Sequence, residues 1–192
     1  MNGEESRKTI MTIIRDVNSI GQSIRPQPSL AAVLPNRANP LDVFERIAIA
    51  EHYDYERLDV FEINISLRGL WGSHDLSLRW NAAEEHIQVF LILESRSPSG
   101  RTDAICRLMS LLNERLRAGH FDYWDRNASM VFRHNISLRG GAKLGVEQAM
   151  DIISTALHAA ESGFPASQYV IWAGKTPEEA LSHTLTDSTT AI

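Results

Sequence analysis

The sequence predicts an α+β fold in which helices flank an antiparallel sheet, in the order α-β-β-β-α-β-β-α. Apolar residues recur at helical spacing in three stretches, which are 39–53, 97–118 and 146–162. Apolar and polar residues alternate with a period of two between 61 and 93, as in strands with one buried face. A ten-residue motif of this alternating kind occurs twice, as VFEINISLRG at 60–69 and VFRHNISLRG at 131–140.

Local signals set the expected ends of the helices. The first helix should begin at Asn39-Pro40, because Asn caps free amides and Pro fits the first helical position. Gly119 and Gly163 should end the second and third helices, since Gly adopts the left-handed closing conformation. A capping box, Thr176-Pro177-Glu178-Glu179, predicts a final helix to about Leu185.

The strands are expected in two groups. Three antiparallel strands joined by short turns are predicted between 61 and 93. Two more are predicted between 120 and 140, turning at Asp125-Arg126-Asn127.

The two copies of the motif indicate two strands of similar sequence rather than a duplicated domain, because the similarity does not continue beyond them. Each copy should point Phe-x-x-x-Ile-x-Leu inward, and Asn and Ser outward. The two copies differ at two positions. Ile63 of the first copy is replaced by His134 in the second, on an otherwise apolar face, and Glu62 is replaced by Arg133, on the solvent-facing side. A histidine there needs a hydrogen-bond partner, so His134 is either a satisfied core residue or part of a polar site.

Composition favours one globular domain at 39–185, preceded by an amphipathic helix and Pro-rich linker at 1–38 and followed by a polar tail at 186–192. The chain has 192 residues, of which 43% are hydrophobic and 22% charged. A net charge of −5 with scattered Lys and Arg argues against nucleic acid as a partner. Because no secretory signal and no run of roughly 20 apolar residues is evident, we expect a cytoplasmic protein without membrane contact.

No pattern in the sequence predicts catalysis, a metal or a cofactor. It contains no HExxH, CxxC, phosphate-binding Gly loop or nucleophile elbow. The single cysteine, Cys106, falls in an apolar helical stretch, where it is expected to be a buried small hydrophobe. We therefore expect a protein that is not an enzyme.

Several stretches resemble the YbjN-type family of bacterial sensory transduction regulators. They are LNERLRAGHFDYWDRNASMVFRHNISLRGG and FPASQYVIWAGKTPEEAL, with looser similarity in NPLDVFERI and LSLRW. The resemblance covers about Asn39 to Leu185. It implies the fold of class I type III secretion chaperones, whose element order is the one predicted above, and a regulatory or chaperone-like binding role without an assigned reaction.

The main functional hypothesis is a non-enzymatic module, acting as a homodimer, that binds a protein or peptide. Its candidate interface residues come from a broad apolar stripe in the second helix and from the outer face of one strand. They are Ala104, Leu108, Leu111, Phe90 and Ile92. The alternative for the stripe is that it fills the core of the subunit.

Two other functions are compatible with the sequence. A small-molecule sensor could hold an anion with Arg133, Arg139 and Lys143 near the Gly140-Gly141 turn. A small enzyme could instead use His120, Asp122 and His134 for proton transfer. The candidate polar site is therefore His134, Arg133 and His120.

Overall fold

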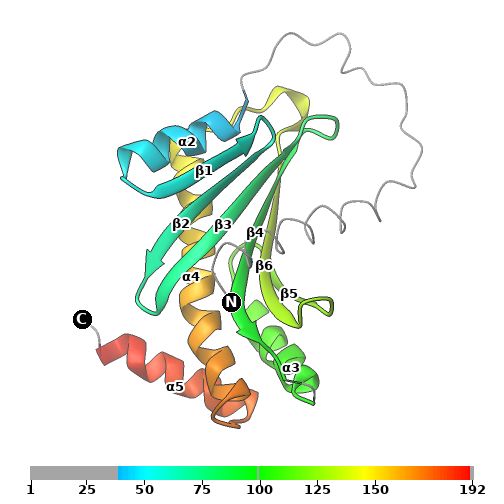
Figure 1. Cartoon of the computed structure of the whole chain (residues 1–192), viewed down its shortest axis with the longest axis vertical. Helices are drawn as coiled ribbons and strands as arrows, with labels where there is room; N and C mark the ends of the chain where they lie inside the picture. The colour runs from blue at the N-terminus through cyan, green and yellow to red at the C-terminus, as the bar shows by residue number, and fades with distance from the viewer. Residues whose placement is uncertain (1–38, 99, 191–192) are drawn as a thin grey trace. The chain divides into compact units, whose positions relative to one another are not determined.

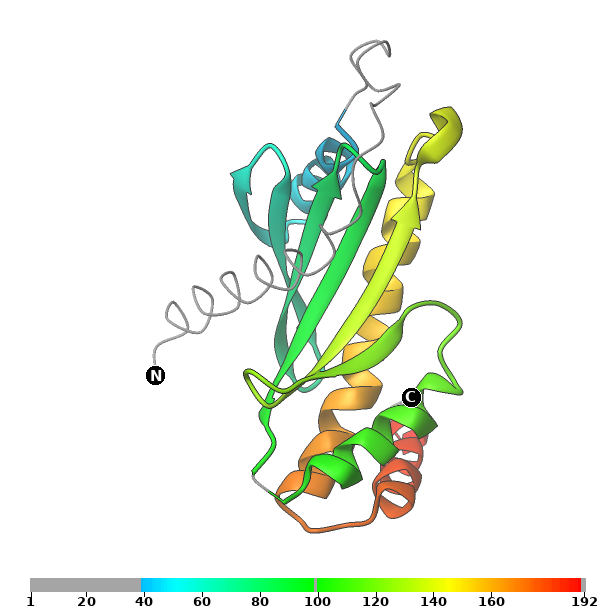
Figure 2. The same cartoon turned by 90° about the vertical axis from the view of Figure 1, so that its right-hand side faces the viewer.

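The computed structural model describes residues 39–98 and 100–190, which form one six-stranded sheet with helices packed against it (Figures 1 and 2). The expected N-terminal helix and linker lie outside these residues. Along the chain the elements are α2 (Leu41–Ala50), β1 (Asp54–Asp59), β2 (Glu62–Gly69), β3 (Gly72–Asn81), β4 (His86–Arg96), α3 (Thr102–Asn113), β5 (His120–Trp124), β6 (Ser129–Ser137), η3 (Arg139–Gly141), α4 (Val146–Ile171) and α5 (Pro177–Thr190). Within the described ranges, no helix has the length and apolar character needed to cross a membrane.

All strand pairings are antiparallel, and the strands lie in the order β1-β2-β3-β4-β6-β5. The second strand group joins the first because β6 pairs with β4, with Phe132 opposite Leu91. β1 and β5 are therefore the two edge strands. The predicted α+β class with an antiparallel sheet is confirmed, but the first group has four strands rather than three.

Strand β1 is the element that the sequence pattern does not reveal. Its sequence, DYERLD, carries charges on both faces and lacks the apolar alternation of a half-buried strand. Arg57 lies on the face of the sheet that bears α2, where its guanidinium pairs with Asp42 and Glu45, each at 3.3 Å. Charged contacts to α2 therefore help to hold a strand that buries little apolar surface.

The predicted starts of the first and last helices are confirmed, whereas α3 begins at Thr102 rather than at Ser97-Pro98 as expected. Oδ1 of Asn39 accepts a hydrogen bond from the N–H of Leu41 at 3.0 Å. Thr176 and Glu179 form a reciprocal capping box, in which each backbone N–H donates to the other's side chain, at 3.0 and 3.2 Å. The helix that follows, α5, continues past the expected end near Leu185 and takes in most of the polar tail.

Gly119 and Gly163 do not end helices, contrary to the expectation from the sequence. α3 stops earlier, at Asn113, and Gly119 lies just before β5 with φ of 73°. A Cβ at Gly119 would clash with Cζ of Phe132, and a Cβ at Gly163 would lie 2.7 Å from Cζ of Phe121. Each glycine is thus required by the close approach of an aromatic ring.

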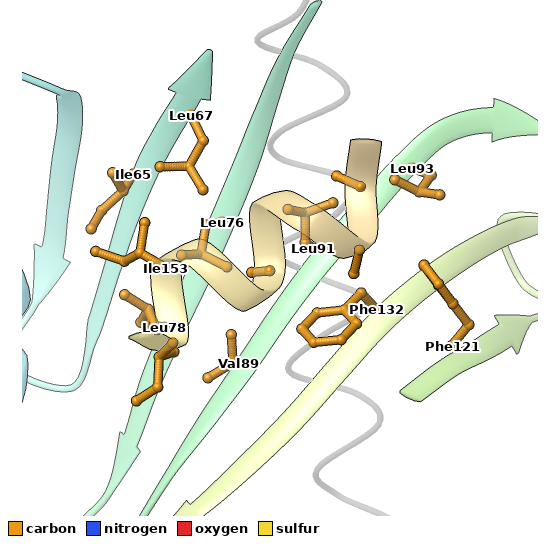
Figure 3. Close-up of a cluster of buried hydrophobic side chains, with 14 of the residues drawn as sticks. Ile65, Leu67, Leu76, Leu78, Val89, Leu91, Leu93, Phe121, Phe132 and Ile153 are labelled. Carbon is orange, nitrogen blue, oxygen red and sulfur yellow. The ribbon is translucent and has the colours of Figure 1, made fainter. Parts of the chain in front are cut away.

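Helix α4 continues without interruption for 26 residues, through both Gly163 and Pro165. The sequence predicts a helix end there, because Pro removes a backbone donor. Burial of Pro165 and Ala166 in the same core as the rest of α4 outweighs this local signal. The small buried residues of α4 are Ala149, Ala156, Ala159, Ala160, Gly163, Ala166 and Ser167. Figure 3 shows inward side chains of the sheet gathered against this helix.

The two copies of the ten-residue motif form β2 and β6, as predicted. The shared inward positions are Ile65 and Leu67 in the first copy, and Ile136 and Leu138 in the second. Phe132 is also buried, but Phe61 precedes β2 and is 49% exposed.

Glu62 is buried, although the sequence places it on the solvent-facing side of the strand. Its Oε2 lies 2.8 Å from Nη2 of Arg79. This ion pair permits the burial of the carboxylate.

The contact of Gly163 with Phe121 predicts the effect of adding a side chain at this position. Gly163→Val should lower the free energy of unfolding by about 1–3 kcal/mol, because extra methyl groups overpack the core. Ser154→Val, at an exposed position of α4, is the matched control and should change stability by less than about 0.5 kcal/mol. Urea unfolding followed by circular dichroism measures both, and a Gly163→Val variant as stable as the wild type would contradict the close packing.

Candidate functional site

The polar residues singled out in the sequence are divided between the two faces of the β5–β6 hairpin. Arg133 lies on the outer face, which is the face turned away from α4, opposite Phe90 and His120. Its Nη1 is 2.8 Å from Oδ2 of Asp122, and its guanidinium lies 5.7 Å from the centroid of the Phe90 ring. Arg133 is therefore engaged by a carboxylate and an aromatic ring of its own sheet.

His134 faces the other side of the sheet, because successive residues of a strand alternate in direction. It lies opposite Val89 and is half-buried. Burial lowers the pKa of His134, and the positive charge that His120 can carry lowers it further, so the neutral imidazole is favoured. His134 thus does not converge with His120 and Asp122 on a common cleft, as a proton-transfer site would require.

Two of the three cations proposed to hold an anion, Arg133 and Arg139, are also separated. Arg133 precedes Arg139 by six residues, most of them in an extended strand, which places them roughly 15–20 Å apart. Arg139 instead lines an open cavity of about 500 Å³ at the other end of β6. The other lining residues are Ala83, Glu84, His86, Asn135 and Ser137. Glu84, whose Oε2 lies 3.4 Å from Nδ1 of His86, places a carboxylate in the same cavity as Arg139.

Cys106 is exposed rather than buried, which corrects the expectation from the sequence. It points away from the core face of α3 and lines an open cavity of about 540 Å³ between α3 and β5. Partial burial of the thiol raises the pKa of Cys106, and the negative charges of Asp103 and Asp125 raise it further. Over 39–98 and 100–190, no three His, Cys, Asp or Glu side chains are grouped so as to hold a metal ion.

The predicted interface residues are used largely within the subunit. Leu108 is fully buried in the core, and Ala104 and Leu111 are partly buried against the same core. α3 packs against β5 on one side and against α4 and α5 on the other, which explains the breadth of its apolar stripe. Phe90 and Ile92 lie on the outer face of β4 but are only 3% and 9% exposed.

The exposed large apolar side chains lie elsewhere, and four of the nine in the described part of the chain belong to β1 or to α2 and the turn on either side of it in sequence. Ile49 in α2, Tyr55 in β1, and Val60 and Phe61 in the turn after β1 are 39–60% exposed. Further exposed apolar residues are scattered singly or in pairs, at Leu70, Trp71, Val146, Met150 and Trp172. We call β1, with Ile49, Val60 and Phe61, the β1 edge. Sequence periodicity missed it, because its apolar residues stand among charges and in a turn.

Comparison with known proteins places the chain in a family. It matches the family model YbjN, described as "Putative bacterial sensory transduction regulator", over residues 40–168. A search of curated proteins found no match. Among solved structures, the chain is similar to a chain in "Crystal Structure of the ExsC-ExsE Complex", with 17% sequence identity and a TM-score of 0.46, covering 62% of this chain and 86% of that one. The family model spans more than half of the sequence, so the chain belongs to the YbjN family.

Proposed function

We propose that this chain is a non-enzymatic regulatory module that acts by binding a segment of another protein, in a chaperone-like manner, at the β1 edge. The observation that carries the proposal is the exposure of Ile49, Tyr55, Val60 and Phe61, at 39–60%, around an edge strand. Exposed apolar side chains beside an edge strand are suited to contact with another polypeptide. Membership of a family of regulators agrees with this role.

The chemistry of the polar residues supports a binding role over a catalytic one. His120 and His134 lie on opposite faces of the sheet, and Arg133 is paired with Asp122. The raised pKa of Cys106 keeps its thiol protonated at neutral pH, which makes it a poor nucleophile. The second candidate function, an anion sensor, rests on the cavity that Arg139 lines, but Glu84 in the same cavity disfavours an anion there.

The homodimer and the cytoplasmic location expected from the sequence remain part of the proposal. A dimer that used α3 would lack an anchor, because α3 exposes no large apolar side chain among its described residues. The β2–β3 turn is a better candidate, since Leu70 is 81% exposed and Trp71 is 48% exposed. Aromatic and aliphatic side chains of this kind are typical interface anchors.

Light scattering tests the homodimer. The wild-type chain should have about twice its subunit mass of 21.5 kDa, and Leu70→Asp should shift it to the monomer without lowering its melting temperature. Leu108→Asp cannot serve this purpose, because it would bury a charge in the core and unfold the subunit. A wild-type mass of 21.5 kDa would rule out the homodimer.

The reactivity of Cys106 tests the claim that this residue is not a nucleophile. Because its pKa is raised above the ordinary value of 9.0, alkylation by iodoacetamide at neutral pH should be slower than for a cysteine peptide. The rate should rise with pH to a midpoint above 9.0, and Asp103→Asn should lower that midpoint. A midpoint below that of the urea-unfolded chain would indicate an activated thiolate.

Photo-crosslinking in the native cell tests the binding role itself. A benzophenone amino acid placed at Tyr55 or Phe61 should give discrete covalent adducts, because these side chains would contact the partner. The same group at Ser154, an exposed position of α4, is the control and should give none of these adducts. An adduct of twice 21.5 kDa would identify a second copy as the occupant, and identical patterns at the three positions would contradict the proposal.

A further inference from the structure

The two edge strands of the sheet differ in whether their outward backbone groups are hydrogen-bonded. At β5, side chains occupy these groups, so a further strand cannot pair there. The N–H of Phe121 donates to Oδ1 of Asn113 at 2.7 Å, and the carbonyl of Phe121 accepts a hydrogen bond from Nδ2 of Asn113 at 3.2 Å. The Asn113 amide thereby occupies the position that a neighbouring strand would take. The N–H of Tyr123, two residues on and so directed the same way, donates to Oδ1 of Asp122 at 3.0 Å. Side chains thus protect this edge.

The β1 edge has no comparable protection. Asp54, Tyr55 and Glu56 are exposed, and β1 is the last strand of the sheet on its side. In the part of the chain that the structure describes, no side chain is hydrogen-bonded to the backbone of residues 54–56. The local side-chain contacts begin only at Arg57, where the register with β2 shifts. An exposed strand edge of this kind can pair with an extended segment of another polypeptide.

The β1 edge is strongly acidic, which defines the charge of a suitable partner. The stretch from Leu41 to Phe61 holds six carboxylates and only two arginines, in a chain with a net charge of −5. Arg57 is already paired with Asp42 and Glu45 on the face that bears α2. Asp54 and Glu56 lie on the outer face, opposite the uncharged residues Ser66 and Asn64. Neither carboxylate is in an ion pair within the described ranges.

The same charges disfavour pairing of two copies of this chain through β1. Two such strands would bring the carboxylates of Asp54 and Glu56 next to those of the other copy, and like charges on adjacent strands repel. A cationic segment would be attracted instead. On the opposite face of β1 the exposed side chain is the ring of Tyr55, which favours an apolar residue on the added strand.

We infer that the β1 edge binds an extended, cationic segment of a partner protein as a seventh strand. Lysine or arginine residues of this segment face Asp54 and Glu56, and its alternate apolar residues lie on the side of Tyr55. This inference rests on the proposed function and adds to it the conformation and the chemistry of the bound segment.

Fluorescence anisotropy with the full chain and a labelled synthetic peptide that alternates lysine and valine tests the inference. The peptide should bind, and binding should weaken as salt is added. The double variant Asp54→Lys/Glu56→Lys should weaken it about tenfold or more, because two attractive pairs become repulsive. The double variant Glu147→Lys/Asp151→Lys makes the same charge change at exposed positions of α4, and should leave the affinity within about twofold. Because all four positions are exposed, both double variants should stay folded, and their melting temperatures check this.

Two further peptides separate strand pairing from general attraction between charges. Methylation of every backbone amide removes the hydrogen-bond donors from both edges of the peptide, so this peptide should not bind. A peptide with glutamate in place of lysine should not bind either. Equal loss of affinity in the two double variants, or unchanged binding of the methylated peptide, would overturn the inference. If that happened while crosslinks at Tyr55 still formed in cells, the binding role would stand and only the nature of the segment would be wrong.

Discussion

The close packing of α4 on one face of the sheet is the constraint on which the rest of the structure depends. The buried residues of α4 are mostly small, and at Gly163 even a methyl group would meet the ring of Phe121 at 2.7 Å. Glycine within a helix costs about 1 kcal/mol relative to alanine, so its presence here reflects packing rather than helix propensity. The long helix crosses most of the strands and fixes which face of the sheet is core (Figure 2).

With one face covered by α4, the ends of the sheet become the distinguishing features of the surface. α3 packs beside β5, and its last residue, Asn113, satisfies the backbone of that edge strand. α2 contacts β1 through ion pairs on one face, yet leaves Asp54, Tyr55 and Glu56 exposed. Natural sheets protect exposed edges against unwanted pairing, and charges are one of their means. At β1 the charges leave the backbone accessible, and under the proposed function they would favour a cationic partner over other segments.

Much of the fold could be predicted from the sequence, because its strongest signals are local. Alternation located β2 and β6, and the side-chain caps at Asn39 and Thr176 marked helix starts. The failures arose where tertiary contacts override local preference. α4 continues through Pro165 because its buried residues, from Ala149 to Ile171, pack into one core on both sides of the proline, and Glu62 is buried because Arg79 neutralises it.

The candidate site was harder to predict, for a related reason. Periodicity identifies residues that fill a core, and it therefore selected Leu108, which is fully buried. Surface residues that bind a partner need no periodicity. Tyr55 stands alone among charges, and Val60 and Phe61 fall in a turn, so only the three-dimensional arrangement shows that they surround one strand edge.

Amide hydrogen exchange of the free chain, resolved by residue, tests most directly whether the two edges differ as described. The N–H of Phe121 should be protected, because the Asn113 side chain accepts its hydrogen bond. Among residues 54–57, the amides directed away from β2 should exchange rapidly in the free chain. Protection of these amides as strong as that of the central strands, in the absence of any partner, would mean that the β1 edge is already occupied and would contradict its role as a binding site.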